Sequence, residues 1–499
     1  MAISDKINSI KTHIGEAYTA IQGKEGTVPA NKNCENLKDA IASIPTGIDT
    51  SDATAIAADI RSGKTAYAKD VKLTGTIEDY DGAASQGSGN YTVKVIDYDG
   101  TVLMEKKGNT GDIIELPEAP THDRLVFQKW SASRTVTDNK VTIGNDNVMV
   151  GATYTTASGQ NEFDITVTKA TGLTVTFNGS GVKDWGDGTS DSETSHTYTA
   201  YGDYMIKWAG SSIPSDLFGS GTMYFLTRAR LAGVTSIADR AFYQCISLIH
   251  ITIPESVTSI GVYAFFRCCS LIATIIPEGI TTLNNSLFSS CNSLEKVVIP
   301  KSVTKIGTTT NSGGDGSFYY CHSLIDIVIP EEVTIIGEYC FYYCYSLTNI
   351  IIPEKVKNIG RGAFTDCTSL TSIVILGTVV ISGTSTFLRC SALKNVVFAE
   401  GIRVAVSGIF NNCNSLMSVG ELGTMTQIVF EAFKGCSSMM KYDFSQATAV
   451  PTLSDVEAFG SINKICKIVV PDNLYDQWIA ATNWSTYADY IYKASEVSE

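Results

Sequence analysis

Apolar residues recur with a fixed period along the second half of the chain. A phenylalanine stands three residues before a cysteine in nine copies, and a leucine, or methionine in the last copy, stands three residues after it. Seven of the eight steps between successive cysteines are 23 residues and one is 30, with the extra residues in a Gly/Ser/Thr-rich stretch over 307–317. This repetition predicts a solenoid, because no unit can bury its apolar side chains alone and stacked units share one core.

Each unit carries the signals of one short strand. Residues 323–329 (SLIDIVI) alternate with period two from Leu324, which is the pattern of a β-strand. A proline follows in five units and ends the strand, because proline cannot donate to a sheet ladder. The Phe-x-x-Cys segment before the strand is expected to form the turn or short helix that closes each coil. The repeating cysteines are Cys245, Cys268, Cys291, Cys321, Cys344, Cys367, Cys390, Cys413 and Cys436.

These nine cysteines are expected to be buried, reduced thiols. Equivalent residues of stacked coils lie about 4.8 Å apart, which is close to disulfide distance. Their side chains point in parallel and do not converge, however, and free cysteine is among the most buried residue types. No histidine or CxxC pair is interleaved with the ladder, so we expect no metal there. Of the pair Cys268-Cys269, the second residue is expected to face outward.

Aromatic residues occupy variable positions beside several of these cysteines. Tyrosine supplies rigid contact area and a hydroxyl group at low entropic cost. Rows of such rings on stacked coils therefore predict a surface that binds the sugar rings of a polysaccharide, and partial burial of the rings between coils is the alternative. The candidate ligand-binding residues are Tyr243, Phe266, Tyr319, Tyr320, His322, Tyr342, Tyr343 and Tyr345.

A second row of apolar residues stands seven residues after the cysteines, where strand alternation places it on the outer face of the sheet. An apolar stripe of this length is not expected to stay in water. It predicts either a subunit interface or an element that covers the strands. The residues of this apolar stripe are Ile275, Val298, Val328, Ile351, Val374 and Val397.

Two β-rich segments precede the repeats. Residues 90–157 contain alternating runs, and residues 160–209 contain the sequence DWGDGT followed by HTY. Asp187 and the glycine after it predict a tight turn. Asp184 and Asp187 could also hold calcium, and a hydrogen-bonded turn is the favoured interpretation.

The first 81 residues are expected to combine helices with a small β module. Ile3, Ile7, Ile10 and Ile14 recur at helical spacing and predict an amphipathic helix of about 20 residues. A lone helix of this length is marginal in water, so we expect it to attach the protein to another chain. A local two-helix cap is the alternative.

Several segments resemble known families. The unit A-F-x-x-C-x-S-L-x-x-I-x-I-P-x-x-V-T-x-I-G, matched closely by 363–370 and 253–261, resembles the BspA-like leucine-rich repeat, which implies a binding or adhesion surface and no catalysis. Residues 90–157 resemble an internalin-type B repeat, and 158–210 resemble a polycystic-kidney-disease (PKD) type β-sandwich. The pattern D-A-T-A…S-G-K-T-A-Y…T-G-T-I over 52–77 resembles modules of bacteriophage tail and baseplate proteins.

Composition excludes several classes of function. The 51 acidic and 37 basic residues give a formal net charge of −14, which argues against a nucleic-acid partner. No apolar run approaches the roughly 18 residues that a membrane span needs, and residues 1–6 show no apolar signal core, so we expect neither membrane insertion nor export by the usual route. The five histidines lie in no recognisable nucleophile or metal pattern, so we expect no enzyme and no cofactor.

These features predict a mostly β, modular chain. We hypothesise a non-enzymatic bacteriophage tail fibre or tail-associated protein, made in the host cytoplasm and exposed on the virion. It would contact other virion proteins through its N-terminal region and a host surface glycan or protein through its repeats, and the fibre resemblance implies a homotrimer. The alternatives are a bacterial BspA-like adhesin and a polysaccharide-degrading tail enzyme. The predicted parts are an attachment region (1–81), a flexible linker (82–89), a B-repeat-like spacer (90–157), a PKD-like sandwich (158–210), the solenoid (211–445) and a C-terminal cap (446–499) in which Trp478 and Trp484 pack.

Overall fold

The computed structural model divides the chain into two compact units, residues 1–84 and 85–499. In the first unit, β1 (Thr65–Ala68) pairs antiparallel with β2 (Val71–Thr74). The predicted N-terminal helix with Ile3, Ile7, Ile10 and Ile14 lies outside the described residues, as does most of the predicted linker. The structure describes residues 65–68, 71–74, 89–168, 172–308, 316–377, 379–381, 383–398, 404–420 and 422–497.

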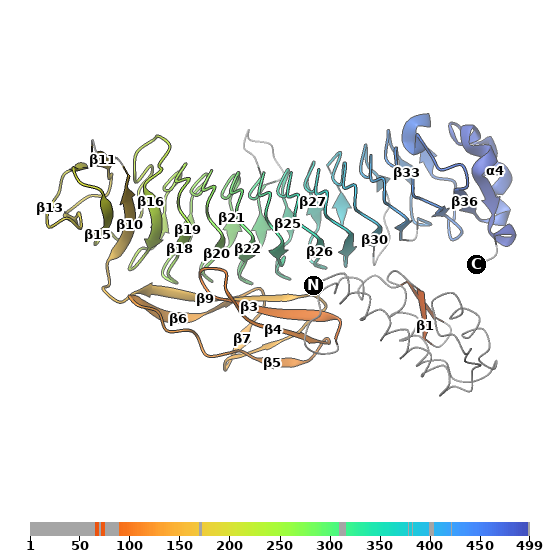
Figure 1. Ribbon diagram of the computed structural model, residues 1–499. Coiled ribbons are helices and arrows are strands. Elements are labelled where there is room, and N and C mark those ends of the chain that lie inside the picture. The colour runs from red at the N-terminus through yellow and green to blue at the C-terminus, as the bar shows by residue number, and fades with distance from the viewer. Residues whose placement is uncertain are drawn as a thin grey trace, which may run out of the picture. The chain divides into compact units, whose positions relative to one another are not determined.

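The repeats form the predicted β-solenoid, in which parallel strands of successive coils build two ladders (Figure 1). Register is kept across the longer step, since Val297 lies opposite Ile327. The first ladder consists of β16 (Leu226–Arg230), β18 (His250–Thr252), β20 (Ala273–Ile275), β22 (Lys296–Val298), β24 (Asp326–Ile327), β26 (Asn349–Ile352), β28 (Ser372–Ile375), β30 (Asn395–Phe398), β32 (Ser418–Val419), β34 (Lys441–Asp443) and β36 (Lys467–Val470). The second consists of β17 (Ser236–Ile237), β19 (Ser259–Ile260), β21 (Thr282–Leu283), β23 (Lys305–Ile306), β25 (Ile335–Ile336), β27 (Asn358–Ile359), β29 (Val380–Ile381), β31 (Val404–Ala405), β33 (Gln427–Ile428) and β35 (Thr452–Leu453).

A column of stacked phenylalanine rings runs through the core of the solenoid. It extends from Phe242 to Phe459, with successive ring centroids 5.2–5.6 Å apart and ring planes within 4–26° of parallel. These rings are almost completely buried. Burial of each large apolar side chain contributes on the order of 1.5–3 kcal/mol, so the column is a main source of the solenoid's stability.

The Phe-x-x-Cys segment forms a tight turn, and the phenylalanine carbonyl at its start accepts two hydrogen bonds. In the first turn the Phe242 carbonyl accepts the Cys245 backbone N–H at 3.2 Å and the Cys268 thiol of the next coil at 3.3 Å. The same pair of bonds recurs from coil to coil until the Cys436 thiol reaches the Phe410 carbonyl. The ladder cysteines are free and buried, which confirms the prediction of reduced thiols.

The segment with the DWGDGT sequence is joined to the solenoid. Its sheet has the order β13-β12-β15-β10-β16-β18, so it continues into the first two solenoid strands. Phe163 of β10 lies 6.5 Å from Phe242, and both belong to one continuous core. The predicted domain boundary near residue 210 therefore does not separate two hydrophobic cores. Residues 161–208 instead cover the open first coil of the solenoid. The strands are β10 (Asn161–Val167), β11 (Leu173–Thr176), β12 (Lys183–Asp184), β13 (Ser190–Asp191), β14 (Ser195–Tyr198) and β15 (Gly202–Trp208).

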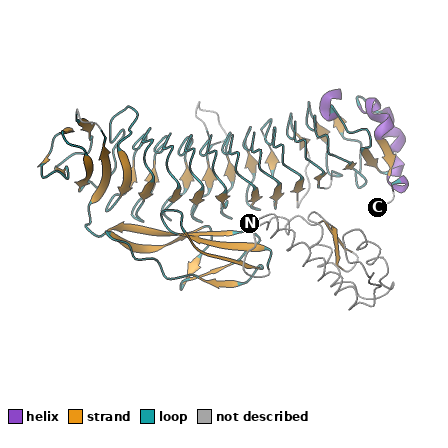
Figure 2. Cartoon of the chain, viewed as in Figure 1, coloured by secondary structure: helices purple, strands orange, loops and turns teal. Residues whose placement is uncertain are grey.

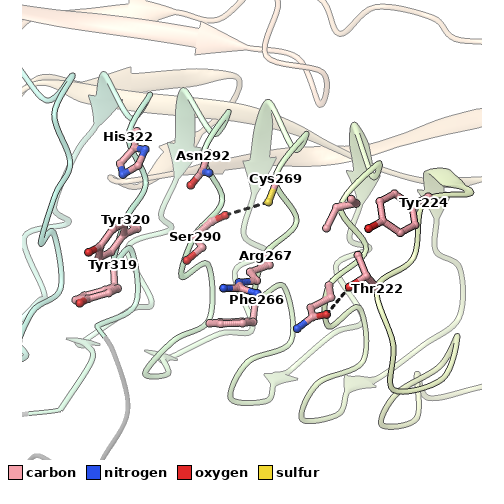
Figure 3. Close-up of a pocket in the computed structure, with 12 residues that line it drawn as sticks. Thr222, Tyr224, Phe266, Arg267, Cys269, Ser290, Asn292, Tyr319, Tyr320 and His322 are labelled. Carbon is pink, nitrogen blue, oxygen red and sulfur yellow. Dashed lines mark hydrogen bonds between the residues drawn. The ribbon is translucent and has the colours of Figure 1, made fainter.

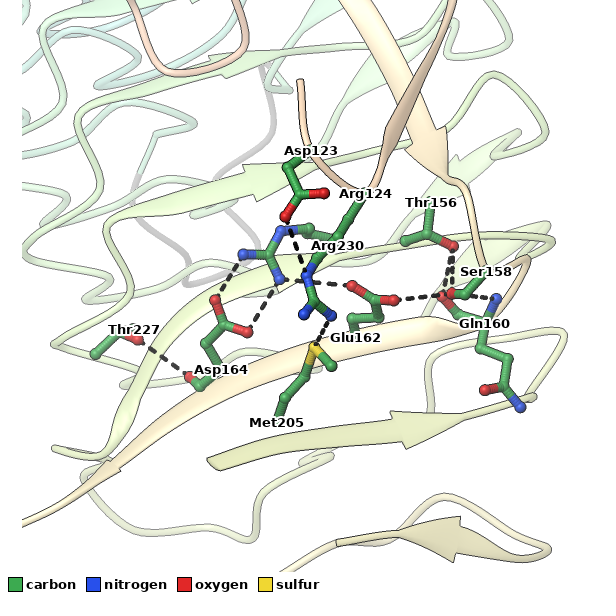
Figure 4. A network of polar contacts seen from close by, with 10 residues as sticks. All are labelled: Asp123, Arg124, Thr156, Ser158, Gln160, Glu162, Asp164, Met205, Thr227 and Arg230. Atoms are coloured by element: carbon green, nitrogen blue, oxygen red, sulfur yellow. Dashed lines mark hydrogen bonds and ion pairs between the residues drawn. The ribbon is translucent and has the colours of Figure 1, made fainter. Parts of the chain in front are cut away.

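A polar network fixes the junction between β10 and β16 (Figure 4). Arg230 of β16 forms two hydrogen bonds with Asp164, at 3.0 and 2.6 Å, and lies 3.7 Å from Glu162. A paired arginine and carboxylate of this geometry is strong and directional. The network therefore sets the register in which the first segment covers the solenoid.

Residues 89–157 form a separate small sheet with the order β4-β3-β9-β6 and a second sheet with the order β5-β8-β7. The two central strands, β3 and β9, are parallel. The strands are β3 (Tyr91–Ile96), β4 (Val102–Gly108), β5 (Ile113–Glu115), β6 (Leu125–Ala132), β7 (Val136–Thr137), β8 (Lys140–Thr142) and β9 (Val148–Thr156). The structure thus has the predicted β segment, and its resemblance to a B repeat stays a prediction.

This small domain lies against the outer face of the first ladder, where β9 contacts β18, β20 and β22. Ile96 and Met149 pack on Ile275 and Val298, and Tyr98 and Val328 lie at the edge of the cluster. The element that covers Ile275, Val298 and Val328 is therefore a domain of the same chain. The predicted subunit interface does not apply to these three residues. Salt bridges surround the cluster, joining Lys94 to Asp326, Lys129 to Glu255 and Arg134 to Glu331.

The C-terminal segment closes the other end of the solenoid with the helices seen there in Figure 2. Trp478 and Trp484 are fully buried, and their ring centroids lie 5.4 Å apart. The Trp484 Nε1–H donates a hydrogen bond to the Pro451 carbonyl. The predicted cap packing is confirmed, although the solenoid continues past residue 445. Phe459 stands 26 residues after Phe433 and still stacks on it. The cap elements are η2 (Val456–Phe459), η3 (Asp472–Leu474), α4 (Tyr475–Ala480), η4 (Trp484–Tyr490), β37 (Ile491–Lys493) and η5 (Ala494–Glu496).

The ladder thiols should resist alkylation in the folded protein. Burial raises the pKa of the Cys344 and Cys367 thiols well above the usual value, and the thiolate is the reactive form. We expect iodoacetamide at pH 8 to leave the Cys367 peptide unlabelled by mass spectrometry, and to label it fully in guanidinium chloride. Rapid labelling of Cys367 in the native protein would show that the ladder opens.

The contact between the small domain and the solenoid depends on a glycine. A Cβ atom at Gly151 of β9 would come 2.6 Å from Ile275 and 2.9 Å from Val298. We expect Gly151→Ala to lower the free energy of unfolding by about 1–3 kcal/mol, as overpacking does, in guanidinium titrations. Gly221→Ala is the control, because a Cβ there meets only the end of Met223 at 3.7 Å. Equal midpoints for both variants would mean that the two surfaces are not tightly packed.

Candidate functional site

A hollow of about 730 Å³ opens on the flank of the solenoid, across the coils of Cys245, Cys268, Cys291 and Cys321 (Figure 3). Its lining combines aromatic rings with hydroxyl groups, amides and one arginine. Concave sites of this size with a few convergent polar groups are typical of ligand binding. The lining residues are Thr222, Tyr224, Gln244, Ile246, Phe266, Arg267, Cys269, Ser290, Asn292, Tyr319, Tyr320 and His322.

The turn that ends in cysteine aligns the side chains of this flank. The residue just before the cysteine has a left-handed backbone in each turn from Cys245 to Cys413, with φ between 57° and 61°. Its N–H donates to the next coil, as from Arg267 to the Ser289 carbonyl at 2.9 Å and from Tyr320 to the Tyr342 carbonyl at 2.8 Å. These bonds hold the two variable positions of every turn in columns along the solenoid.

Aromatic residues fill one column on both sides of a gap. Tyr243 stacks on Phe266, and Tyr319 stacks on Tyr342, each pair with ring centroids 5.0 Å apart. The Cys291 coil between the pairs carries serine at both variable positions, so Phe266 and Tyr319 stand two coils apart, about 10 Å by strand spacing. Ser289 takes the aromatic position in this coil and is fully buried, whereas Ser290 lines the hollow between the coils of Phe266 and Tyr319 (Figure 3).

The other rings extend this surface away from the hollow. Tyr320 meets Tyr343 edge to face with centroids 4.6 Å apart, and His322 stacks on Tyr345 at 4.8 Å. Tyr345 is exposed, and the other rings of the predicted set are half-buried. The rings therefore pack between coils and stay partly exposed, so the predicted partial burial is observed and sugar binding stays a prediction.

The lining of the hollow contains one arginine and no carboxylate. None of its lining residues is aspartate or glutamate. The Arg267 guanidinium lies 5.5 Å from the centre of the Phe266 ring. Burial lowers the pKa of His322, so its ring is neutral at pH 7, and its buried Nε2 has no hydrogen-bond partner among the described residues.

The half-buried Cys269 thiol also lines the hollow, as expected for the outward member of its pair. It donates to the Ser290 carbonyl at 3.6 Å. Burial raises the pKa of this thiol, so it stays protonated at pH 7 and is a poor nucleophile. It contributes a small, polarisable side chain to the lining of the hollow.

Half of the predicted ligand-binding residues line the hollow, namely Phe266, Tyr319, Tyr320 and His322. Tyr243 stacks on Phe266. Tyr342, Tyr343 and Tyr345 lie on the coil that follows Tyr319 and Tyr320. Sequence reasoning missed Arg267, Ser290, Asn292 and the residues from 222–246. The signal that could have found them was the pair Ser289-Ser290, which interrupts the aromatic positions of the neighbouring units.

The remaining predicted residues lie elsewhere. Ile351, Val374 and Val397 continue the apolar stripe on β26, β28 and β30, where they align in register, and their role in an interface stays a prediction. Asp187 accepts hydrogen bonds from the Thr189 N–H and hydroxyl and lies 2.7 Å from His196. The turn is thus hydrogen-bonded, and no group of three or more potential metal ligands occurs in the described part of the chain. Within the same residues, no helix has the length and apolar character of a membrane span.

Comparison with known proteins identifies the class of the solenoid. Residues 211–312 and 311–440 match the family described as the BspA type leucine rich repeat region, in six copies. The repeat region therefore belongs to the BspA-type leucine-rich repeats, as its unit sequence predicted. No curated protein matches the chain.

Several solved structures are similar to the chain. A leucine-rich repeat protein from Bacteroides ovatus is 23% identical with a TM-score of 0.39, and the match covers 64% of this chain and 98% of that one. The Treponema pallidum leucine rich repeat protein is 30% identical with a TM-score of 0.28, over 37% of this chain and 80% of that one. A leucine rich cell surface protein from Faecalibacterium prausnitzii is 24% identical with a TM-score of 0.31, over 64% and 97%.

Proposed function

We propose that the chain is a non-enzymatic adhesion protein that binds a cell-surface carbohydrate in the hollow between Phe266 and Tyr319. The lining of the hollow supports this function, because Phe266 and Tyr319 stand about two coil spacings apart and Ser290, which carries no ring, lines the space between their coils. Aromatic faces give apolar contact area to the C–H faces of a sugar. The Ser290 hydroxyl and the Asn292 amide offer hydrogen bonds to sugar hydroxyl groups.

The chemistry of the hollow favours binding without turnover. Most glycoside hydrolases need two carboxyl groups on either side of the scissile bond, and the lining residues supply none. A cysteine nucleophile would need a base within hydrogen-bond reach, whereas Cys269 donates to a backbone carbonyl. These features support the binding protein over the polysaccharide-degrading enzyme.

The carrier of this binding module is proposed to be a bacteriophage tail fibre, assembled as a homotrimer and attached to the virion through residues 1–81. The support for this carrier is the resemblance of residues 52–77 to tail and baseplate modules. A bacterial BspA-like adhesin is the second candidate, and the family match of residues 211–440 supports it. Both carriers use the same hollow for the same purpose.

Filling the hollow with a ring should abolish binding. Ser290→Tyr introduces a ring at a position where Tyr320 and Tyr343 adopt the same φ of 61°, so the backbone accepts it. On an array of neutral and acidic bacterial surface oligosaccharides, we expect the wild type to bind a subset and Ser290→Tyr to lose at least tenfold in affinity for that subset.

Asn412→Tyr is the matched control for this experiment. Asn412 occupies the same repeat position, is exposed, and has a φ of 59°, but it lies outside the hollow. It should bind like the wild type, and both variants should keep the wild-type melting temperature. A wild type that retains no glycan, or a Ser290→Tyr variant that binds normally, would contradict the proposal.

Mass spectrometry distinguishes the two carriers. We expect the chain in purified phage particles from a culture of its source, at a fixed copy ratio to a tail protein. Its presence only in the bacterial envelope fraction would exclude the tail fibre and support the adhesin.

A further inference from the structure

The charge of the hollow is opposite to that of the protein. The chain carries a formal net charge of −14, and surface carboxylates repel an anionic ligand almost everywhere on such a protein. The hollow lacks carboxylates, and Arg267 is the one lining residue with a formal charge at pH 7. The hollow therefore offers an anionic ligand a positive group with no carboxylate in the lining.

Arg267 differs from Arg240 and Arg389 in having no acidic partner among the described residues. Among the described residues no carboxylate forms an ion pair with it. Its guanidinium lies over the Phe266 ring. By contrast, Arg240 on the preceding coil lies 3.1 Å from Asp216. Arg389, which occupies the same repeat position as Arg267, is hydrogen-bonded through Nε to Asp366 at 2.7 Å and through Nη2 to the same carboxylate.

The repeat itself explains this difference. The residue just before the cysteine in one coil lies beside its equivalent in the next coil, which is how Asp366 reaches Arg389. The equivalents on either side of Arg267 are Gln244 and Ser290, and both are neutral. The column therefore places an aspartate beside Arg389 and leaves the Arg267 guanidinium open to a ligand.

The position of the guanidinium matches the position proposed for the sugar. In Figure 3 the Arg267 side chain lies along the Phe266 ring, at the edge of the gap that Ser290 leaves open. Arginine presents a planar pair of N–H donors that fits a carboxylate with two parallel hydrogen bonds. A sugar ring between Phe266 and Tyr319 could thus direct a ring carboxylate to Arg267 while its hydroxyl groups face Ser290 and Asn292.

We infer that the ligand of the hollow is an acidic sugar, a uronic or sialic acid unit whose carboxylate pairs with Arg267. This inference rests on the proposed carbohydrate-binding function and adds the chemical class of the ligand. It also explains selectivity, because a charge-assisted bidentate pair distinguishes an acidic sugar from its neutral counterpart.

The test compares acidic oligosaccharides with counterparts that differ only in charge. The probes are glucuronic-acid-terminated and sialic-acid-terminated oligosaccharides, each beside its methyl ester, together with phosphorylated sugars. We expect wild-type protein to prefer a free acid over its ester by about 10- to 100-fold. Arg267→Gln should remove this preference for the free acid.

Arg389→Gln is the matched control, because it removes the same charge from the same repeat position outside the hollow. It should keep the wild-type preference for the free acid. Equal binding of acids and esters by the wild type, a preference for phosphorylated sugars alone, or an unchanged preference in Arg267→Gln would each overturn the inference while glycan binding itself stands. If no probe or other oligosaccharide binds, the proposed function fails as well.

Discussion

The solenoid depends on the carbonyl oxygen of one phenylalanine in each turn. This oxygen accepts the backbone N–H of the cysteine that closes its own turn and the thiol of the cysteine in the next coil, as at Phe341 with Cys344 and Cys367. Both bonds are buried, and a buried carbonyl without partners would cost free energy. A thiol is small and apolar enough to lie beside the stacked rings and still donate. One residue type therefore satisfies the backbone and fills the core from the Phe242 turn to the Phe410 turn.

Repetition of this unit leaves surfaces that the unit cannot bury, and the rest of the chain covers several of them. The first coil exposes the end of the phenylalanine column, which Phe163 of β10 meets. The last ring, Phe459, contacts Trp484 in the cap. On the outer face of the ladder, Met149 of β9 covers Ile275 and Val298. These additions are consequences of the solenoid, because an open repeat core needs a cap at each end.

Features of this chain were predictable from sequence where they are local and periodic. The turn, the buried thiols and the phenylalanine column repeat every 23 residues, so each copy supports the interpretation of the others. The last coil was missed because its 26-residue step breaks the period, although Phe459 stacks like the rest. The sharing of a core by β10 and β16 depends on strand pairing between distant segments, and no local pattern encodes that register. For the site, the aromatic positions could be predicted from the sequence. Predicting the hollow also required knowing which coil lacks aromatic residues at these positions.

The candidate site thus arises from departures within the repeat. Residues at the same position of successive repeats form a column, so each side chain lies beside its equivalents in the coils before and after it. One substitution therefore changes the contacts with both neighbours. Two serines in the Cys291 coil separate Phe266 from Tyr319, and the neutral neighbours of Arg267 leave its charge without the partner that Arg389 has. The backbone turn is the same in all these coils, with φ near 60° before the cysteine. A solenoid of this kind can therefore change its ligand through the variable positions of a single coil while the carbonyl and thiol bonds that hold the fold stay in place.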